Sequence, residues 1–168
     1  MPRMRASSAA KEYNLTAITI GSRETGEKDL FITLFSLEQG KLHVAARGTK
    51  KTVSSLRGAG QLFNMGECQI VSRRGSDLLT EWTPMQSFPG IKNDLRKLSL
   101  AGYIARFINE TAADGHADPE LFRIVENIFF ILQSNSNYDI IKLAFEWGYL
   151  ETTGQAFETG ICVSCGNS

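Results

Sequence analysis

The chain has 168 residues and carries 18 basic and 18 acidic side chains, so its formal net charge is zero. A chain of this length can form one domain or two small ones around a substantial hydrophobic core. No apolar run is long enough to cross a bilayer, which argues against a membrane protein.

The amino-terminal residues 1–11 predict a flexible tail. Their letters, MPRMRASSAAK, are mostly small or polar and lack the apolar stretch of a secretory signal. Export is therefore not supported, and we expect a cytoplasmic protein in a reducing environment.

Five short runs with the composition of β-strands follow the tail. They are rich in Ile, Leu, Val, Thr and Phe, and glycine-bearing turns separate most of them. The runs are NLTAITIGS, LFITLFSL, KLHVAA, LFNMGECQIVS and DLLTEW, and SSLRGAG predicts a short helical turn between the third and the fourth. Five sequential strands must protect their edges, and a small barrel of the OB-fold type does so. We therefore predict an OB-fold over residues 12–86.

The rest of the chain, residues 87–168, changes to helical periodicity. The segment FPGIKND is typical of a connector. The first predicted helix has its apolar stripe at Leu95, Leu98, Ala101, Ala105 and Ile108. The second predicted helix carries Leu121, Val125, Ile128 and Leu132 on one face, with Phe122 and Phe129 beside them.

Two further features complete the helical prediction. Asp118 is a good N-cap and Pro119 suits the first position of the second helix. The third helix is expected from about Tyr138 to Gly154, with Gly148 as a possible interruption. The predicted fold class is α+β: a five-stranded barrel followed by an all-helical domain.

Positive charge is concentrated in the first half of the chain. Residues 1–80 hold 12 basic and 7 acidic side chains, whereas residues 81–168 hold 6 and 11. The segment KLHVAARGTKKTVSSLRG, residues 41–58, contains five cations and no acidic residue. This asymmetry suggests that the two halves meet different partners and that the first half faces a polyanion.

Strand alternation places Lys41 and Arg47 on the face opposite to the apolar side chains of KLHVAA. Cations on a barrel face and its loops are what contact with nucleic-acid phosphates requires. The predicted DNA-binding residues are Lys41, Arg47, Lys50, Lys51 and Arg57, with Arg73 and Arg74 as weaker candidates. The alternative is a solvated charged surface without a ligand.

Aromatic residues give weaker support for nucleic-acid binding. Phe31, Phe35 and Phe63 occupy apolar strand positions, so we expect them to pack in the core rather than to stack on bases. Trp82 is compatible with either role.

The cysteines suggest a partial metal site. Cys162 and Cys165, in CVSCG, have the spacing of two zinc ligands, but a structural zinc site needs four and no second pair is present. The alternatives are a redox dithiol and a pair without a role. Cys68 lies within a predicted strand, where we expect a small buried side chain.

The chain resembles the RecO family of DNA repair proteins. The segments that carry the resemblance are, in order, TGEKDLFITLFS, EQGKLHVAARGTKK, SSLRGAGQLF, DLLTE, DPELF, AFEWGYLETTG and CVSCG. They include the turn of Gly26, Glu27 and Asp29, the pair Gly40–Lys41, and the run Ala46, Arg47, Gly48 with Lys50 and Lys51 behind it. The family's second Cys-x-x-Cys pair would fall after Ser168, so this chain looks truncated and its zinc finger incomplete.

The resemblance implies an OB-fold followed by a helical domain. It also implies binding of single- and double-stranded DNA, annealing of complementary strands, and a non-enzymatic mediator role. With RecR, the family helps RecA to replace the single-stranded-DNA-binding protein on gapped DNA. The acidic tail of that binding protein would dock on the helical domain, where Arg106 and Arg123 are possible contacts. The location implied is the bacterial cytoplasm, in association with the nucleoid.

Two other classes of function stay open. One is a small OB-fold module that binds RNA. The other is a thiol oxidoreductase that uses Cys162 and Cys165.

Overall fold

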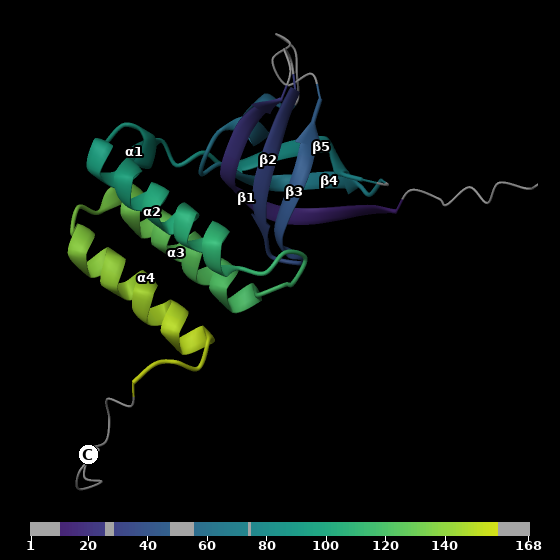
Figure 1. Cartoon of the computed structure of the whole chain (residues 1–168). Helices are drawn as coiled ribbons and strands as arrows, with labels where there is room; N and C mark the ends of the chain where they lie inside the picture. Colours follow the sequence, from purple (N-terminus) through teal and green to yellow (C-terminus); the bar gives the residue numbers. More distant parts are fainter. Residues whose placement is uncertain (1–10, 26–28, 48–55, 74, 158–168) are drawn as a thin grey trace, which may run out of the picture.

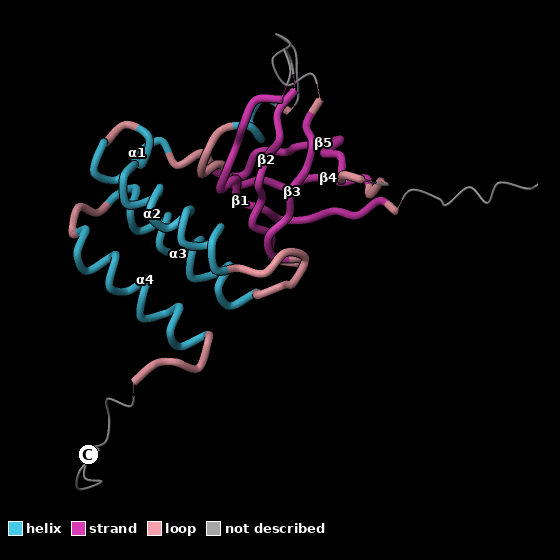
Figure 2. The backbone as a smooth tube through the Cα atoms, viewed as in Figure 1, coloured by secondary structure: helices cyan, strands magenta, loops and turns pink. Residues whose placement is uncertain are grey.

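The computed structural model describes residues 11–25, 29–47, 56–73 and 75–157. Five strands form a barrel, and the helices lie together against one side of it (Figures 1 and 2). The strands are β1 (Glu12–Thr25), β2 (Asp29–Ser36), β3 (Gly40–Ala46), β4 (Met65–Val71) and β5 (Asp77–Gln86). The helices are η1 (Arg57–Gly60, a 3₁₀ turn), α1 (Pro89–Lys92), α2 (Leu95–Thr111), α3 (Pro119–Ser134) and α4 (Tyr138–Thr152). In the described residues, no helix is long and apolar enough to cross a membrane.

The barrel closes in the order β1-β2-β3-β5-β4. The long strand β1 takes part in both halves, because its first part pairs with β4 and its second part with β2. A register shift between Thr19 and Gly21 marks where β1 bends from one half to the other. Parallel pairing of β3 with β5 closes the ring. The predicted fold class, an OB-fold barrel followed by helices, is confirmed.

Side chains that point inward fill the barrel. They come from every strand and include Leu15, Ile32, Leu34, Val44, Ile70 and Leu79. Trp82 belongs to this interior and is only 4 % exposed, so it is not available for stacking on a base. Cys68 is also buried, as predicted, and its burial raises the pKa of the thiol to about 12. At neutral pH this cysteine is therefore an unreactive thiol.

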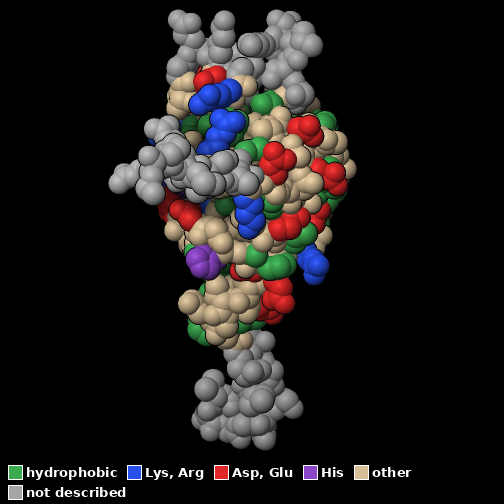
Figure 3. Space-filling view, turned by 90° about the vertical axis from the view of Figure 1, so that its right-hand side faces the viewer, with side chains coloured by type: hydrophobic (Ala, Val, Ile, Leu, Met, Phe, Trp, Pro, Cys, Tyr) green, Lys and Arg blue, Asp and Glu red, His purple; other side chains and the backbone are tan. Residues whose placement is uncertain are grey.

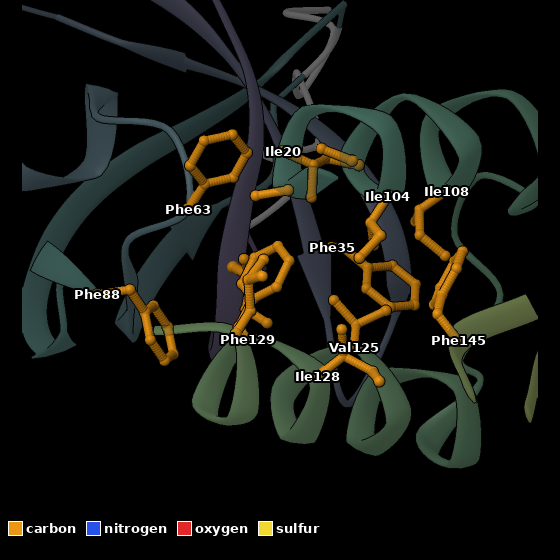
Figure 4. Packing of buried hydrophobic residues seen from close by; sticks show 14 of the residues in the cluster. Ile20, Phe35, Phe63, Phe88, Ile104, Ile108, Val125, Ile128, Phe129 and Phe145 are labelled. Atoms are coloured by element: carbon orange, nitrogen blue, oxygen red, sulfur yellow. The ribbon is translucent and has the colours of Figure 1, made fainter. Parts of the chain in front are cut away.

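A second core joins the barrel to the helices (Figure 4). Phe35 and Phe63 contribute from the barrel, and Phe129 of α3 meets the ring of Phe63 edge-on at 5.7 Å between centroids. Phe88, on the connection between β5 and α1, also meets the ring of Phe129 edge-on, at the same separation. Phe35 packs against Phe122 at 5.8 Å. Barrel and helices therefore share buried apolar surface rather than standing apart.

The helical predictions hold for α3 and need correction elsewhere. All six predicted apolar residues of α3 are buried. In α2, Leu95 and Leu98 are exposed, contrary to the prediction. The residue of the first turn that faces α3 is Lys97, whose ammonium donates a hydrogen bond to the backbone carbonyl of Gln133 at 3.0 Å. The connector at Pro89 forms the short helix α1.

Gly148 does not interrupt α4, although the sequence suggested that it might. The helix runs from Tyr138 to Thr152 without a break. A Cβ at Gly148 would lie 3.1 Å from Cδ1 of Ile124 on α3. The glycine therefore permits a close approach of α4 to α3, and this contact explains its place inside a helix.

Asp118 caps α3, and its removal has a predictable effect. Its carboxylate accepts a hydrogen bond from the backbone N–H of Leu121 at 3.0 Å. We expect Asp118→Ala to lower the free energy of unfolding by about 1 kcal/mol, because the first turn loses this acceptor. Asp118→Asn keeps a capping oxygen and should stay close to wild type. Urea unfolding of both variants measures the difference, and equal stability of the two would contradict the assigned cap.

Candidate nucleic-acid interface

The outward face of β1, β2 and β3 is covered over only part of its length. Phe35 is on this face and is buried under α3. Farther along the same strand, Phe31 and Thr33 also point outward, because Ile32 and Leu34 fill the barrel interior. Phe31 and Thr33 are only half-buried, whereas Phe35 is fully buried. Pairing across the strands sets Arg23 beside Phe31 and His43 beside Thr33.

Arg23, Phe31 and His43 form a contact cluster on this open face. The guanidinium carbon of Arg23 lies 4.6 Å from the centroid of the Phe31 ring. The rings of Phe31 and His43 are nearly parallel, with an angle of 11° and 5.9 Å between centroids. Nδ1 of His43 lies 3.2 Å from Oγ1 of Thr33. Core packing is confirmed for Phe35 and Phe63 but is wrong for Phe31, which is half-buried and belongs to neither hydrophobic core.

Arg47 follows β3 directly and is exposed. Leu30 pairs with Glu24 of β1 and with Ala46 of β3, so Arg47 and Arg23 lie at the same end of the barrel. This end is the one away from the helices (Figure 1). A polyanion that approached here would meet cations without first displacing the helical domain.

Lys41 lies at the opposite end of β3 and has a different environment. Its ammonium donates to the backbone carbonyl of Asn109 at 2.7 Å and lies 3.2 Å from the carboxylate of Asp114. The side chain is only 11 % exposed. Lys41 therefore connects the barrel to the end of α2 and to the loop behind it. A phosphate contact by Lys41 stays a prediction, and it would have to compete with these two oxygens.

The remaining predicted site residues are only partly described. Arg73 follows β4 and is exposed. Arg57 begins η1, and its side chain is not described. Lys50, Lys51, Arg74, Cys162 and Cys165 lie outside the described residues. Within the described ranges, no group of three or more His, Cys, Asp or Glu side chains could hold a metal ion.

The side of the barrel formed by β1, β4 and β5 is acidic. Glu38, Glu67 and Glu81 line a surface hollow of about 450 Å³. Figure 3 shows several acidic side chains close together on one side of the molecule, with further acidic side chains next to basic ones. The excess of basic over acidic side chains in the first half of the chain is therefore not distributed evenly over the barrel surface. Phosphates would be repelled from the β4–β5 side, which favours the open face of β1, β2 and β3.

The closed barrel and the helices that share its second core define an OB-fold protein with an appended helical domain. Residues 10–88 match the family described as "Recombination protein O N terminal", and residues 92–168 match "Recombination protein O C terminal". The chain belongs to this family, that of the DNA repair protein RecO.

Individual relatives give the same assignment. The chain is 30 % identical over 155 residues to the DNA repair protein RecO of Synechococcus elongatus, with 91 % of this chain and 58 % of the relative covered. It is 30 % identical over 153 residues to that of Halalkalibacterium halodurans, covering 91 % and 60 %. For Geobacter metallireducens the identity is 29 % over 150 residues, covering 89 % and 62 %. The chain thus spans about three-fifths of the length of these curated relatives.

Proposed function

We propose that this chain binds DNA through the open face of β1, β2 and β3 and acts as a non-enzymatic recombination mediator. The observation that carries the proposal is the exposure of Arg47 and Arg23 at the end of the barrel away from the helices, in a chain of the RecO family. Cations placed there would neutralise backbone phosphates of either single- or double-stranded DNA. Lys50 and Lys51 would extend this positive surface.

Annealing of complementary strands follows physically from such a surface. Two DNA strands repel each other, and a shared cationic surface screens that repulsion and raises their local concentration. With RecR as a partner, the protein would help RecA to replace the single-stranded-DNA-binding protein. The acidic tail of that protein would dock on the helical domain. The cytoplasm, in association with the nucleoid, is the proposed location.

Zinc binding is part of the proposal only as half a site. Cys162 and Cys165 would supply two of the four thiolates that a structural zinc ion takes. Zinc per chain, measured on purified protein before and after Cys162→Ser, tests this. Loss of bound zinc in the variant supports the assignment, and zinc that is absent or unchanged contradicts it.

Salt dependence is the sharpest test of phosphate binding. If Arg47, Lys50, Lys51 and Arg57 each neutralise one phosphate, log affinity for single-stranded DNA should fall with log salt at a slope of about −3. Arg47→Gln should make the slope shallower by about 0.7, because one contact is lost. The measurement is fluorescence anisotropy of a labelled oligonucleotide between about 50 and 200 mM salt.

A matched control is available on the helical domain. Arg123 is exposed on α3, so Arg123→Gln removes the same charge at a distance from the proposed surface and should leave the slope unchanged. If both variants behave like wild type, the barrel surface is not the phosphate site. Competition between RNA and DNA of equal length separates a repair mediator from an RNA-binding module, and a strong preference for RNA would overturn the mediator role.

A further inference from the structure

Two adjoining hollows run along the uncovered barrel face beside α2. The first, of about 420 Å³, is lined by Arg23, Phe31, His43 and Asn109 among others. The second, of about 250 Å³, includes Leu62 and Arg106 in its lining. Thr33 and Asn109 line both hollows, so the two adjoin, and together they are called the groove.

We propose that this groove binds the bases of single-stranded DNA, with the rings of His43 and Phe31 as the stacking surface. The inference deepens the proposed function and rests on it. It assigns a base-contacting site that is separate from the phosphate contacts of Arg47 and its neighbours.

The geometry of the rings is suited to stacking. The Phe31 and His43 rings are nearly parallel, with 11° between their planes, so a base that stacks on His43 lies parallel to both rings. The ring of His43 is oriented by a hydrogen bond between Nδ1 and Oγ1 of Thr33, and the carboxylate of Asp114 lies 3.7 Å from Nε2. Its side chain is nevertheless 38 % exposed. A base can therefore stack on a ring whose orientation is already set, so that little conformational entropy is lost on binding.

Each of the two hollows has an arginine in its lining. Arg23 lines the first hollow, where its guanidinium contacts the face of the Phe31 ring. Arg106 lines the second hollow, and its side chain is 80 % exposed. Its Nε donates to Glu110 at 2.8 Å, which leaves the remaining N–H donors of the guanidinium for a phosphate. Stacking rings together with cations form the arrangement that binds single strands without sequence preference.

The test compares two oligonucleotides of equal length, one with bases and one with abasic sites throughout. Both carry the same phosphates, so any difference in affinity reports contact with bases. We expect the full-length wild-type chain to bind the base-bearing strand about tenfold more tightly. His43→Ala should remove most of this preference, and His43→Phe should restore it, because the ring returns without the imidazole nitrogens.

A second variant guards against a folding artefact. Phe31→Leu keeps an apolar side chain on β2 and removes only the ring, and thermal unfolding checks that it stays folded. It should also reduce the base preference while leaving the salt slope at its wild-type value. If wild type shows no preference for bases, or if the variants keep it, the stacking site is overturned although phosphate binding stands. If neither oligonucleotide binds in a salt-dependent way, the proposed function fails first.

Discussion

We expect Gly40→Ala to lower the free energy of unfolding by about 3 kcal/mol, chiefly by separating the barrel from the loop between α2 and α3. Gly40 has a φ of +64°, and a Cβ there would lie 1.8 Å from the backbone oxygen of His116. The left-handed conformation alone makes an L-residue less stable by about 1–2 kcal/mol. Relief of the clash would also break the bond from the N–H of Gly115 to the carbonyl of Lys41.

A nearby glycine isolates the steric part of this effect. Gly115 has a φ of +69°, close to that of Gly40, but a Cβ built on it meets nothing within 4 Å. Gly115→Ala should therefore show only the conformational effect of about 1–2 kcal/mol. Urea unfolding of both variants gives the comparison. Equal losses of stability would show that the turn between β2 and β3 does not depend on close contact with the loop.

The OB-fold and the order of the helices could be predicted from the sequence because local patterns determine them. Short runs rich in Ile, Leu, Val, Thr and Phe indicate the strands, and glycine-bearing turns mark most of the strand ends. The N-cap at Asp118 and the apolar stripe behind it locate α3. These patterns involve residues that are close together in the sequence, so a short segment is enough to recognise each of them.

The candidate site could be predicted only in part, because it depends on which part of the barrel the helices cover. Phe31 and Phe35 point to the same face of β2. Nothing near them in the sequence shows that α3 shields only Phe35. The use of Lys41 to hold Asn109 and Asp114 joins residues about seventy positions apart. The acidic side of the barrel likewise arises from strands that are distant in sequence.

The other large effect is expected at Phe129, at the centre of the core that joins the two parts. We expect Phe129→Ala to lower the free energy of unfolding by about 4 kcal/mol, because it leaves a cavity among fully buried aromatic rings. The ring is 0 % exposed and contacts Phe63 from the barrel side and Phe88 from the connection to α1. Removing it weakens the barrel and the helices at the same interface (Figure 4).

Phe157 provides the matched control, since the same substitution there removes a ring that is 75 % exposed. Phe157→Ala should change the free energy of unfolding by no more than about 0.5 kcal/mol.

Urea unfolding followed by circular dichroism and by tryptophan fluorescence measures both variants. Trp82 reports on the barrel interior and Trp147 on α4, while circular dichroism follows the helices. Because the core is shared, the unfolding transitions of the wild type followed by circular dichroism and by fluorescence should coincide. Phe129→Ala should move both transitions to lower urea concentrations. A shift of the circular dichroism transition with only part of the fluorescence change would mean that the barrel folds independently of this core, and that the helices stabilise it less than their contacts indicate.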